Sequence, residues 1–409
     1  MDKFFNKRGS FSIFATMLFV SLAFAVFSII NASGTLAIHG TINSFGTIWG
    51  KSILGEYDLF MKNRYGIFAF YEEKTGVEEK LQKYIDYSLK NKSYIKYSKV
   101  QCDLNGYSLI NTDNLEKQIN MITLEGIKPQ ITLENTNGTD VERTINSLWI
   151  IKNLPSYNKT EKLYITGIAN KIKEGISFSK IIGDVTTDKY IFDFFKDYME
   201  GRDLGETYFK CEVEYIITGK YSDEKNKNYT GDKIILLRNI LNLYYLYSCE
   251  EKRNSSLAIA EIISPGAMAF ITQGVLLEAW AYAEAKNDLK ILYDNKAVAL
   301  LKDDLNWALS IENVFDIDEN GQVFTKEEKE SYILPQKTEG ILYSDYLRLL
   351  LQGVPEKTKL LRILDLIQIN AKYLYRDYFL VRDCHCGLTY SFNVNGDRYE
   401  FDDEYVQRK

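Results

Sequence analysis

The chain has few of the residues on which most enzyme and metal sites depend. Its 409 residues include two histidines and five cysteines. The nucleotide-binding and hydrolase patterns G-x-x-x-x-G-K-[ST], G-x-G-x-x-G, G-x-S-x-G and H-E-x-x-H do not occur in it. Because no nucleophile is paired with a base in the sequence, we expect a protein that is not an enzyme.

Proline is also scarce, and basic residues do not outnumber acidic ones. The sequence has only five prolines and no repeat or low-complexity tract, which argues against a stalk or linker. Its 30 tyrosines indicate a folded chain. The formal net charge is -6, which argues against nucleic acid as a partner. The length allows one large domain or two smaller ones.

Charge is absent from one long stretch. Between Gly9 and Gly50 the sequence has no Asp, Glu, Lys or Arg, and residues 10–30 are almost entirely apolar. This run has the length of a helix that crosses a membrane, and it follows a basic leader at residues 1–9. We expect a retained transmembrane helix, with a cleaved signal peptide or a core helix as alternatives. The basic leader places the amino terminus in the cytoplasm and the remainder outside the cell membrane as a single-pass protein.

The helix is predicted to continue outside the bilayer over residues 31–70, followed by an ectodomain at 71–409. Apolar residues recur there at threes and fours and form an amphipathic stripe that could pack on partner helices: Ile38, Ile42, Phe45, Trp49, Ile53, Tyr57 and Phe60. Small or polar residues occupy the opposite face and would let another helix come close: Gly40, Asn43, Gly46, Gly50 and Gly55. The residues expected to form the anchor itself are Phe11, Phe14, Leu18, Leu22 and Phe27.

The ectodomain is expected to have an α+β fold, with helices and antiparallel sheet mixed. Periodicity and start signals predict helices at 77–91, 113–125, 140–153, 232–248, 265–292, 344–353 and 355–375. Alternation predicts a strand at 206–219, a hairpin turn at Asn105-Gly106, and a hairpin around Asn395-Gly396. The apolar run at 265–292 could be a second span, but Glu278 and Glu284 favour a protein core in which they have partners.

Several segments together resemble known families. "KRGSFSIFATMLF" resembles the start of the TadE/TadG-like proteins of tight-adherence (Flp-type) pili. The whole chain is more similar to a domain-of-unknown-function family of Gram-positive bacteria with the same start. The similarity lies in "EYDLFMKNRYGIFAF" (56–70), "CEVEYIITGKYSDEKN" (211–226), "IILLRNILNLYYL" (234–246), residues 280–311 and residues 342–370. The resemblance implies an amino-terminal membrane helix, an extracytoplasmic α+β domain and a pilus or envelope assembly partner.

The leader fits a prepilin only in part. Lys7, Arg8, Gly9 and Ser10 match the basic residues and the glycine before a prepilin cleavage point. The fifth position after that point is Phe14, where the resemblance implies a glutamate that pairs with a neighbour's new amino terminus. This departure favours a pilin-like or accessory component over a major pilin.

Two patterns could hold a metal. Cys384, His385 and Cys386 offer soft ligands, but a second cluster is missing. Buried thiols, or a disulfide to Cys102, Cys211 or Cys249, are the alternatives, and His39 fits a polar face.

The segment Asp316–Glu327 satisfies the EF-hand pattern D-x-[DN]-x-[DN]-G-x5-E. Calcium would be held by oxygens of Asp316, Asp318, Asn320, Gln322 and Glu327. The same residues also read as the tip of a β-hairpin with its turn at Asn320-Gly321. The sequence thus predicts an anchored interaction protein, with a calcium-stabilised extracellular binding or adhesion module as the alternative.

Overall fold

The computed structural model describes residues 7–130, 147–157, 163–199, 201, 204–317, 323–326, 331–337 and 339–405. The chain divides into two compact units. Unit 1 is built from Met1–Asp58, Ala69–Ser108 and Asp383–Lys409, and unit 2 from Leu59–Phe68 and Leu109–Arg382. The ectodomain expected over 71–409 is therefore shared between two units, and unit 1 is assembled from both ends of the chain.

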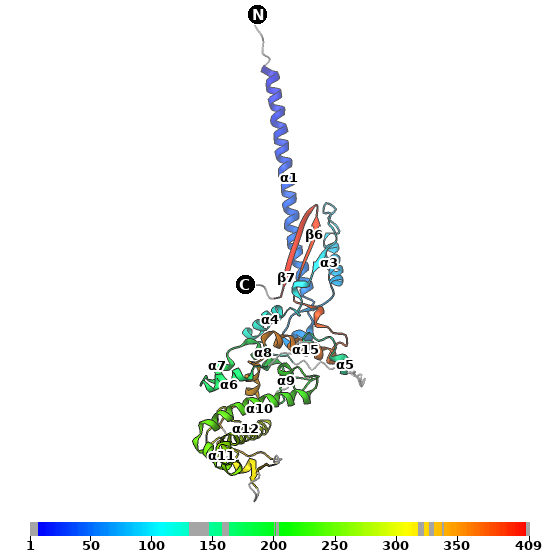
Figure 1. Ribbon diagram of the computed structural model, residues 1–409. Coiled ribbons are helices and arrows are strands. Elements are labelled where there is room, and N and C mark those ends of the chain that lie inside the picture. Colours follow the sequence, from blue (N-terminus) through cyan, green and yellow to red (C-terminus); the bar gives the residue numbers. More distant parts are fainter. Residues whose placement is uncertain are drawn as a thin grey trace. The chain divides into compact units, whose positions relative to one another are not determined.

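Unit 1 combines one long helix with a small antiparallel sheet (Figure 1). Its elements are α1 (Lys7–Leu54), β1 (Phe70–Tyr71), α3 (Lys74–Leu89), β2 (Gln101–Asp103), η1 (Asn105–Tyr107), β5 (Cys384–His385), β6 (Gly387–Val394) and β7 (Asp397–Glu404). The main sheet has the order β2-β6-β7, and β1 pairs with β5. The α+β class predicted from the sequence is confirmed.

The carboxy-terminal hairpin forms as predicted. Asn395 and Gly396 both have positive φ, 52° and 102°, which a two-residue turn between right-twisted strands requires. The register sets Phe392 opposite Tyr399 and Tyr390 opposite Phe401, so the alternating aromatic residues share one face. That face closes a core with α1 and α3.

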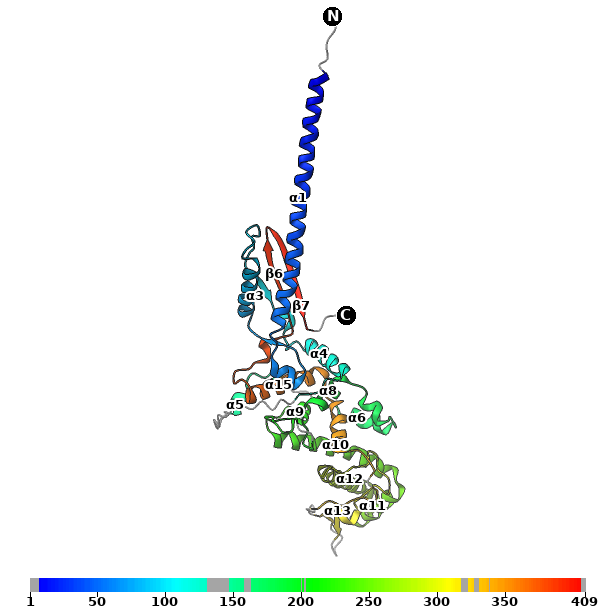
Figure 2. The same cartoon turned by 180° about the vertical axis from the view of Figure 1, so that it is seen from behind.

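Unit 2 is mostly helical. Its elements are α2 (Leu59–Tyr65), α4 (Thr112–Glu125), α5 (Ser147–Ile150), α6 (Ile165–Lys173), α7 (Phe178–Ile182), α8 (Thr186–Phe194), α9 (Glu212–Thr218), α10 (Asp223–Ser248), α11 (Glu250–Ile263), η2 (Gly266–Met268), α12 (Ala269–Tyr293), α13 (Ile311–Val314), β3 (Phe315–Ile317), β4 (Val323–Thr325), α14 (Tyr343–Leu351) and α15 (Glu356–Leu374). Helices α10, α11 and α12 pack on one another, as Figures 1 and 2 both show.

Helix α15 is the most enclosed element of unit 2. Its residues from Thr358 to Lys372 are buried on every side, and the polar side chains among them have partners: Lys359 pairs with Asp188, and Arg362 donates to the carbonyls of Ile216 and Ile217. The sequence predicted this helix and α14, together with α3, α4, α10 and α12. Of the helix predicted at 140–153, Ser147–Ile150 form α5 and residues 151–153 form a turn, while 140–146 lie outside the described residues.

The strand predicted at 206–219 is wrong, because Glu212–Thr218 form helix α9. Every residue from Glu212 to Ile217 is buried, so the alternation of polar and apolar residues does not separate two faces. The two glutamates of the first turn accept hydrogen bonds from the backbone amides of Lys196 and Tyr198. A fully buried helix and a buried strand cannot be separated by periodicity alone.

The hairpin predicted at Asn105-Gly106 is also wrong. Those residues form the 3-10 turn η1, and β2 pairs instead with β6, nearly 300 positions later in the chain. Strand β2 therefore pairs with a strand that is remote in sequence, and a local turn signal could not predict this pairing.

Candidate functional site

The apolar half of α1 is the most exposed apolar surface in the described chain. Every residue from Phe11 to Ala37 is exposed, including the anchor residues Phe14, Leu18 and Leu22. Among the described residues, α1 is the one helix long and apolar enough to cross a membrane, with a mean hydropathy of 2.5 over its most apolar window. Lys7, Arg8, Gly9 and Ser10 lie in its first turns. Such a surface is stable only in lipid or against other apolar helices.

The carboxy-terminal half of α1 is built into unit 1. Ile42, Trp49 and Ile53 are buried among β6, β7 and α3, while Ile38 and Phe45 pack at the edge of the same core. The stripe that was expected to pack on partner helices is therefore covered by the protein's own sheet and α3. The helix ends at Leu54 rather than continuing to residue 70, and Phe60 belongs to α2 of unit 2.

Two glycines of α1 set how closely the sheet approaches. A Cβ on Gly46 would overlap the ring of Phe401, and one on Gly50 would overlap the carboxylate of Asp403. The Tyr390 hydroxyl also donates to the carbonyl of Gly46. These glycines therefore admit a strand rather than the second helix that the sequence suggested. Gly40, by contrast, has open space around it.

Polar contacts fix α1 against the hairpin and α3. His39 Nδ1 and the Tyr399 hydroxyl share a 2.5 Å hydrogen bond, and His39 Nε2 lies 3.7 Å from Asp397. The Trp49 indole donates to Ser88 on α3 at 3.0 Å. His39 is thus a packing residue on the polar side of α1, as the sequence indicated.

The cysteines do not form a metal cluster or disulfides in the described part of the chain. All five are free thiols, and four of them are buried. Burial raises the pKa of the Cys102 thiol to about 12, which keeps that thiol protonated. The ring of His385 lies 5.7 Å from that of Phe70 at a tilt of 39°, and burial lowers the pKa of His385. The described residues hold no group of three His, Cys, Asp or Glu suited to a metal ion.

Only one of the five predicted calcium ligands can be placed. Asp316 lies on β3, which pairs antiparallel with β4 so that Asp316 is opposite Phe324. Its carboxylate is 3.8 Å from the Lys326 ammonium. Asp318, Asn320, Gln322 and Glu327 lie outside the described residues. The strands flanking them pair as in a hairpin, and calcium binding stays a prediction.

A buried charge network joins α10 to α12 in unit 2. Arg238 contacts Asp288 at 2.9 Å, and Lys302 contacts Glu284 at 2.7 Å and Asp288 at 2.8 Å. All four side chains are at most 1 % exposed. Glu284 also accepts from the amides of Ala308 and Leu309. The partners that the sequence required for a buried Glu284 are therefore present, and α12 is a core helix.

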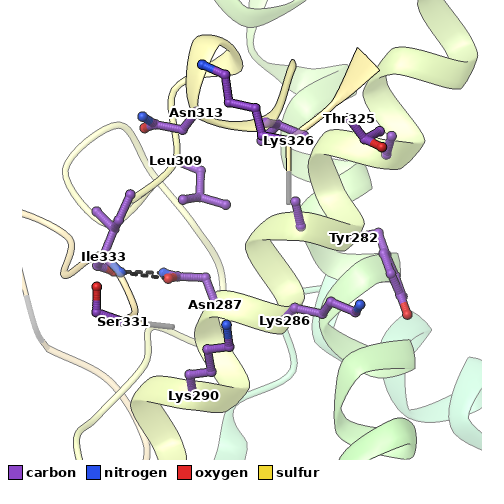
Figure 3. Close-up of a pocket in the computed structure, with 13 residues that line it drawn as sticks. Tyr282, Lys286, Asn287, Lys290, Leu309, Asn313, Thr325, Lys326, Ser331 and Ile333 are labelled. Atoms are coloured by element: carbon purple, nitrogen blue, oxygen red, sulfur yellow. Dashed lines mark hydrogen bonds between the residues drawn. The ribbon is translucent and has the colours of Figure 1, made fainter. Parts of the chain in front are cut away.

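A pocket of about 370 Å³ opens beside α12, on a face that the sequence gave no reason to single out (Figure 3). One wall is α12 and the other comes from α13, β4 and residues 331–333. Its lining includes Lys286, Lys290 and Lys326. Spacing alone could have indicated the two lysines on α12, but not the opposite wall.

These observations define a protein with a helix long and apolar enough to cross a membrane, whose α+β unit is interrupted in the sequence by a larger helical unit. The chain belongs to a family of unknown function (DUF5702), whose model matches residues 109–396. That match spans nearly all of unit 2 and the strands β5 and β6. No curated protein and no solved structure matches the chain.

Proposed function

We propose that this protein is a membrane-anchored, extracytoplasmic component of a pilus-like or related envelope assembly. It would act through protein–protein contacts and not as an enzyme. The resemblance of its leader to TadE/TadG-like proteins supports the proposal, and Phe14 makes an accessory or pilin-like role fit better than that of a major fibre subunit.

One observation carries the proposal: α1 has two halves with different environments. The apolar half projects from unit 1 with its side chains exposed, and the other half packs against an antiparallel hairpin. An apolar half for lipid followed by a packed amphipathic half is the plan of the long first helix of pilins. The basic leader supports an amino terminus in the cytoplasm.

The amino terminus and intact mass of the protein from native membranes test the anchor. A chain that starts at Ser10 would mean that a prepilin peptidase accepts the leader despite Phe14. A chain that starts at Met1 or Asp2 would fit an accessory protein held by a signal anchor. A start near Ser33 would remove the anchor and contradict the proposal.

Photo-cross-linking tests the assembly role. Ile48 is 56 % exposed on α1 outside the apolar half, whereas Ile42 on the same helix is buried. A photo-reactive residue at Ile48 should cross-link to another protein in native membranes, and one at Ile42 should react only within the chain. If Ile48 yields no protein adduct, the interaction role is wrong.

A further inference from the structure

The buried charge network of unit 2 holds an amine and a carboxylate in direct contact. The Lys302 Nζ atom lies 2.8 Å from Oδ1 of Asp288 and 2.7 Å from Oε1 of Glu284. Its third contact is the carbonyl of Asn306 at 2.8 Å, so each of its three hydrogens has an acceptor. Asp288 follows Glu284 by four positions on α12, which sets both carboxylates on one face of the helix. The amine is therefore held in one position between two acids.

This contact is closed to water. The side chains of Lys302, Glu284 and Asp288 are at most 1 % exposed. The backbone at Ala308 and Leu309 encloses the site, since both amides donate to Glu284. Charged forms are costly in such a site, and a proton passed from Nζ to Oδ1 leaves a neutral amine beside a neutral carboxyl group. That neutral pair is the reactive form for making an amide.

The other oxygen of Asp288 is held by hydrogen-bond donors. Arg238 donates from Nε to Oδ2 at 2.9 Å, and its Nη2 atom lies 2.9 Å from the same oxygen. Asn242 donates from Nδ2 to Oδ2 at 3.5 Å. Fixed donors on one oxygen stabilise the negative charge that develops there when a nucleophile adds to the carboxyl carbon. The Asp288 carboxyl group therefore has a nucleophile at one oxygen and stabilising donors at the other.

We propose that Lys302 and Asp288 condense to an intramolecular isopeptide bond, with Glu284 as the proton carrier. One proton passes from Nζ to Oδ1 of Asp288, and the Nζ lone pair then attacks Cγ to form the C–N bond. Glu284 takes a second proton from Nζ and delivers it to Oδ1. The Cγ–Oδ1 bond breaks with its electron pair on oxygen, and Oδ1 leaves as water. Nζ keeps one hydrogen, and the step needs no oxidant, reductant or co-reactant.

Two features favour the product. Holding the groups in contact turns an encounter between molecules into a step within one chain, for which effective concentrations reach about 10⁵–10⁸ M. The reaction also removes one buried positive and one buried negative charge, whose desolvation is costly. In the product, the amide oxygen keeps its donors from Arg238, and the remaining N–H can still donate to Glu284. The bond joins α12 to the segment that follows it, between positions 14 apart in the sequence.

Peptide mapping by mass spectrometry tests the bond in the full chain purified from membranes. Trypsin should release residues 287–290 and residues 297–326 as one branched peptide, lighter than the two separate peptides by one water molecule. Recovery of the separate peptides, with cleavage after Lys302, would overturn the proposal. A linear 287–290 peptide lighter by one water would indicate a succinimide at Asp288 and would also overturn it.

Two variants assign the roles of the side chains. Lys302→Arg keeps the positive charge but removes the primary amine, so the branched peptide should be absent. Glu284→Gln keeps both reacting groups but cannot carry a proton, so branching should be at least about tenfold slower in pulse-labelled chains. Protection of the buried Cys211 thiol from alkylation shows that each variant is folded. Branching at the wild-type rate in Glu284→Gln would refute the role of Glu284.

A second buried ion pair is the control within the same chain. Lys359 lies 2.6 Å from Asp188, and their side chains are 4 % and 9 % exposed. The further carboxylate near Lys359 is that of Glu356, at 3.4 Å, and its side chain is 40 % exposed. Because this pair has no buried proton carrier, trypsin should cleave after Lys359. A cross-link to Asp188 would show that contact alone is enough and that Glu284 is not required.

Discussion

At the scale of single residues, Glu214 is a buried acid of unit 2 with one carboxylate oxygen left without a hydrogen bond among the described residues. It is fully buried on α9, where Oε1 accepts from the Tyr198 amide and the Tyr343 hydroxyl at 2.9 Å each. Its Oε2 has no hydrogen-bond partner among the described residues. Burial, aided by the nearby charge of Asp197, raises the pKa of this carboxyl to about 8.

This raised pKa predicts a pH dependence of stability. Because the folded pKa of Glu214 exceeds its ordinary value of 4.5, its contribution is complete below that value and is lost as pH rises through about 8. Between pH 6 and 8 the free energy of unfolding should fall by about 2 kcal/mol through this group. Thermal unfolding of the full chain at several pH values measures the slope.

Glu214→Gln should flatten that slope, because its amide does not titrate. The matched control is Glu224→Gln at an exposed position on α10, which should keep the wild-type slope. A slope retained by Glu214→Gln would mean that another group titrates. Asp365, whose pKa burial raises to about 6, acts mainly below this window.

Gly46 is a second residue for which the structure predicts whether a substitution raises or lowers stability. Gly46→Ala should destabilise unit 1 by about 1–3 kcal/mol, because its Cβ would overlap the ring of Phe401. Gly40→Ala on the same helix meets open space and should stabilise by up to about 1 kcal/mol through helix propensity. Thermal unfolding of both variants in detergent measures the two effects. Equal changes in stability would contradict the close contact between Gly46 and Phe401.

At the scale of elements, the buried charges determine how α10 and α12 pack. Lys302→Met leaves Glu284 and Asp288 with one fewer cation in a site closed to water. Removing one member of such a network costs about 3–5 kcal/mol. Chemical denaturation should show this loss.

The matched control is an exposed pair in the same unit. Lys128 lies 2.7 Å from Asp193 with its side chain 61 % exposed, and Lys128→Met should cost no more than about 1 kcal/mol. If the two substitutions cost the same, the network contributes no more than a surface ion pair.

At the scale of the whole molecule, unit 1 can close only when both ends of the chain are present. Strand β7 comes from the last residues, yet it covers α1 from the first. A chain that stops after Gly396 lacks β7 and should lose this cover, while unit 2 keeps its core. Such long-range closure is slow and comes late in folding.

Buried thiols report on this prediction. Cys102 lies in unit 1 and Cys211 in unit 2, each 3 % exposed. In the truncated chain, alkylation of Cys102 should accelerate by at least about tenfold while Cys211 stays protected. Peptide mapping by mass spectrometry separates the two sites. Protection of both thiols would show that β7 is dispensable, and reaction of both would show that the units unfold together.

The sequence by itself determined the features that depend on local pattern. The absence of charge between Gly9 and Gly50 is enough to define an apolar helix, and Asn395-Gly396 is enough to define a tight turn. The segments of α4 and α15 were also predictable, α4 because its apolar residues repeat with the helical period and α15 because of its length and the start signal at Pro355.

The tertiary structure alone decided which surfaces meet. The sequence predicted the apolar stripe on α1 and the small residues beside it. It did not predict that both pack against the hairpin β6–β7, which lies at the other end of the chain. The strand prediction failed at α9 because a helix that is buried on all sides has no periodic pattern of polar and apolar residues. The pocket beside α12 needs a second wall that includes Leu309, Val314 and Ile333, which follow that helix in the chain and cannot be placed opposite it from local pattern. Local free energies fix single elements, whereas contacts between distant segments depend on the whole chain at once.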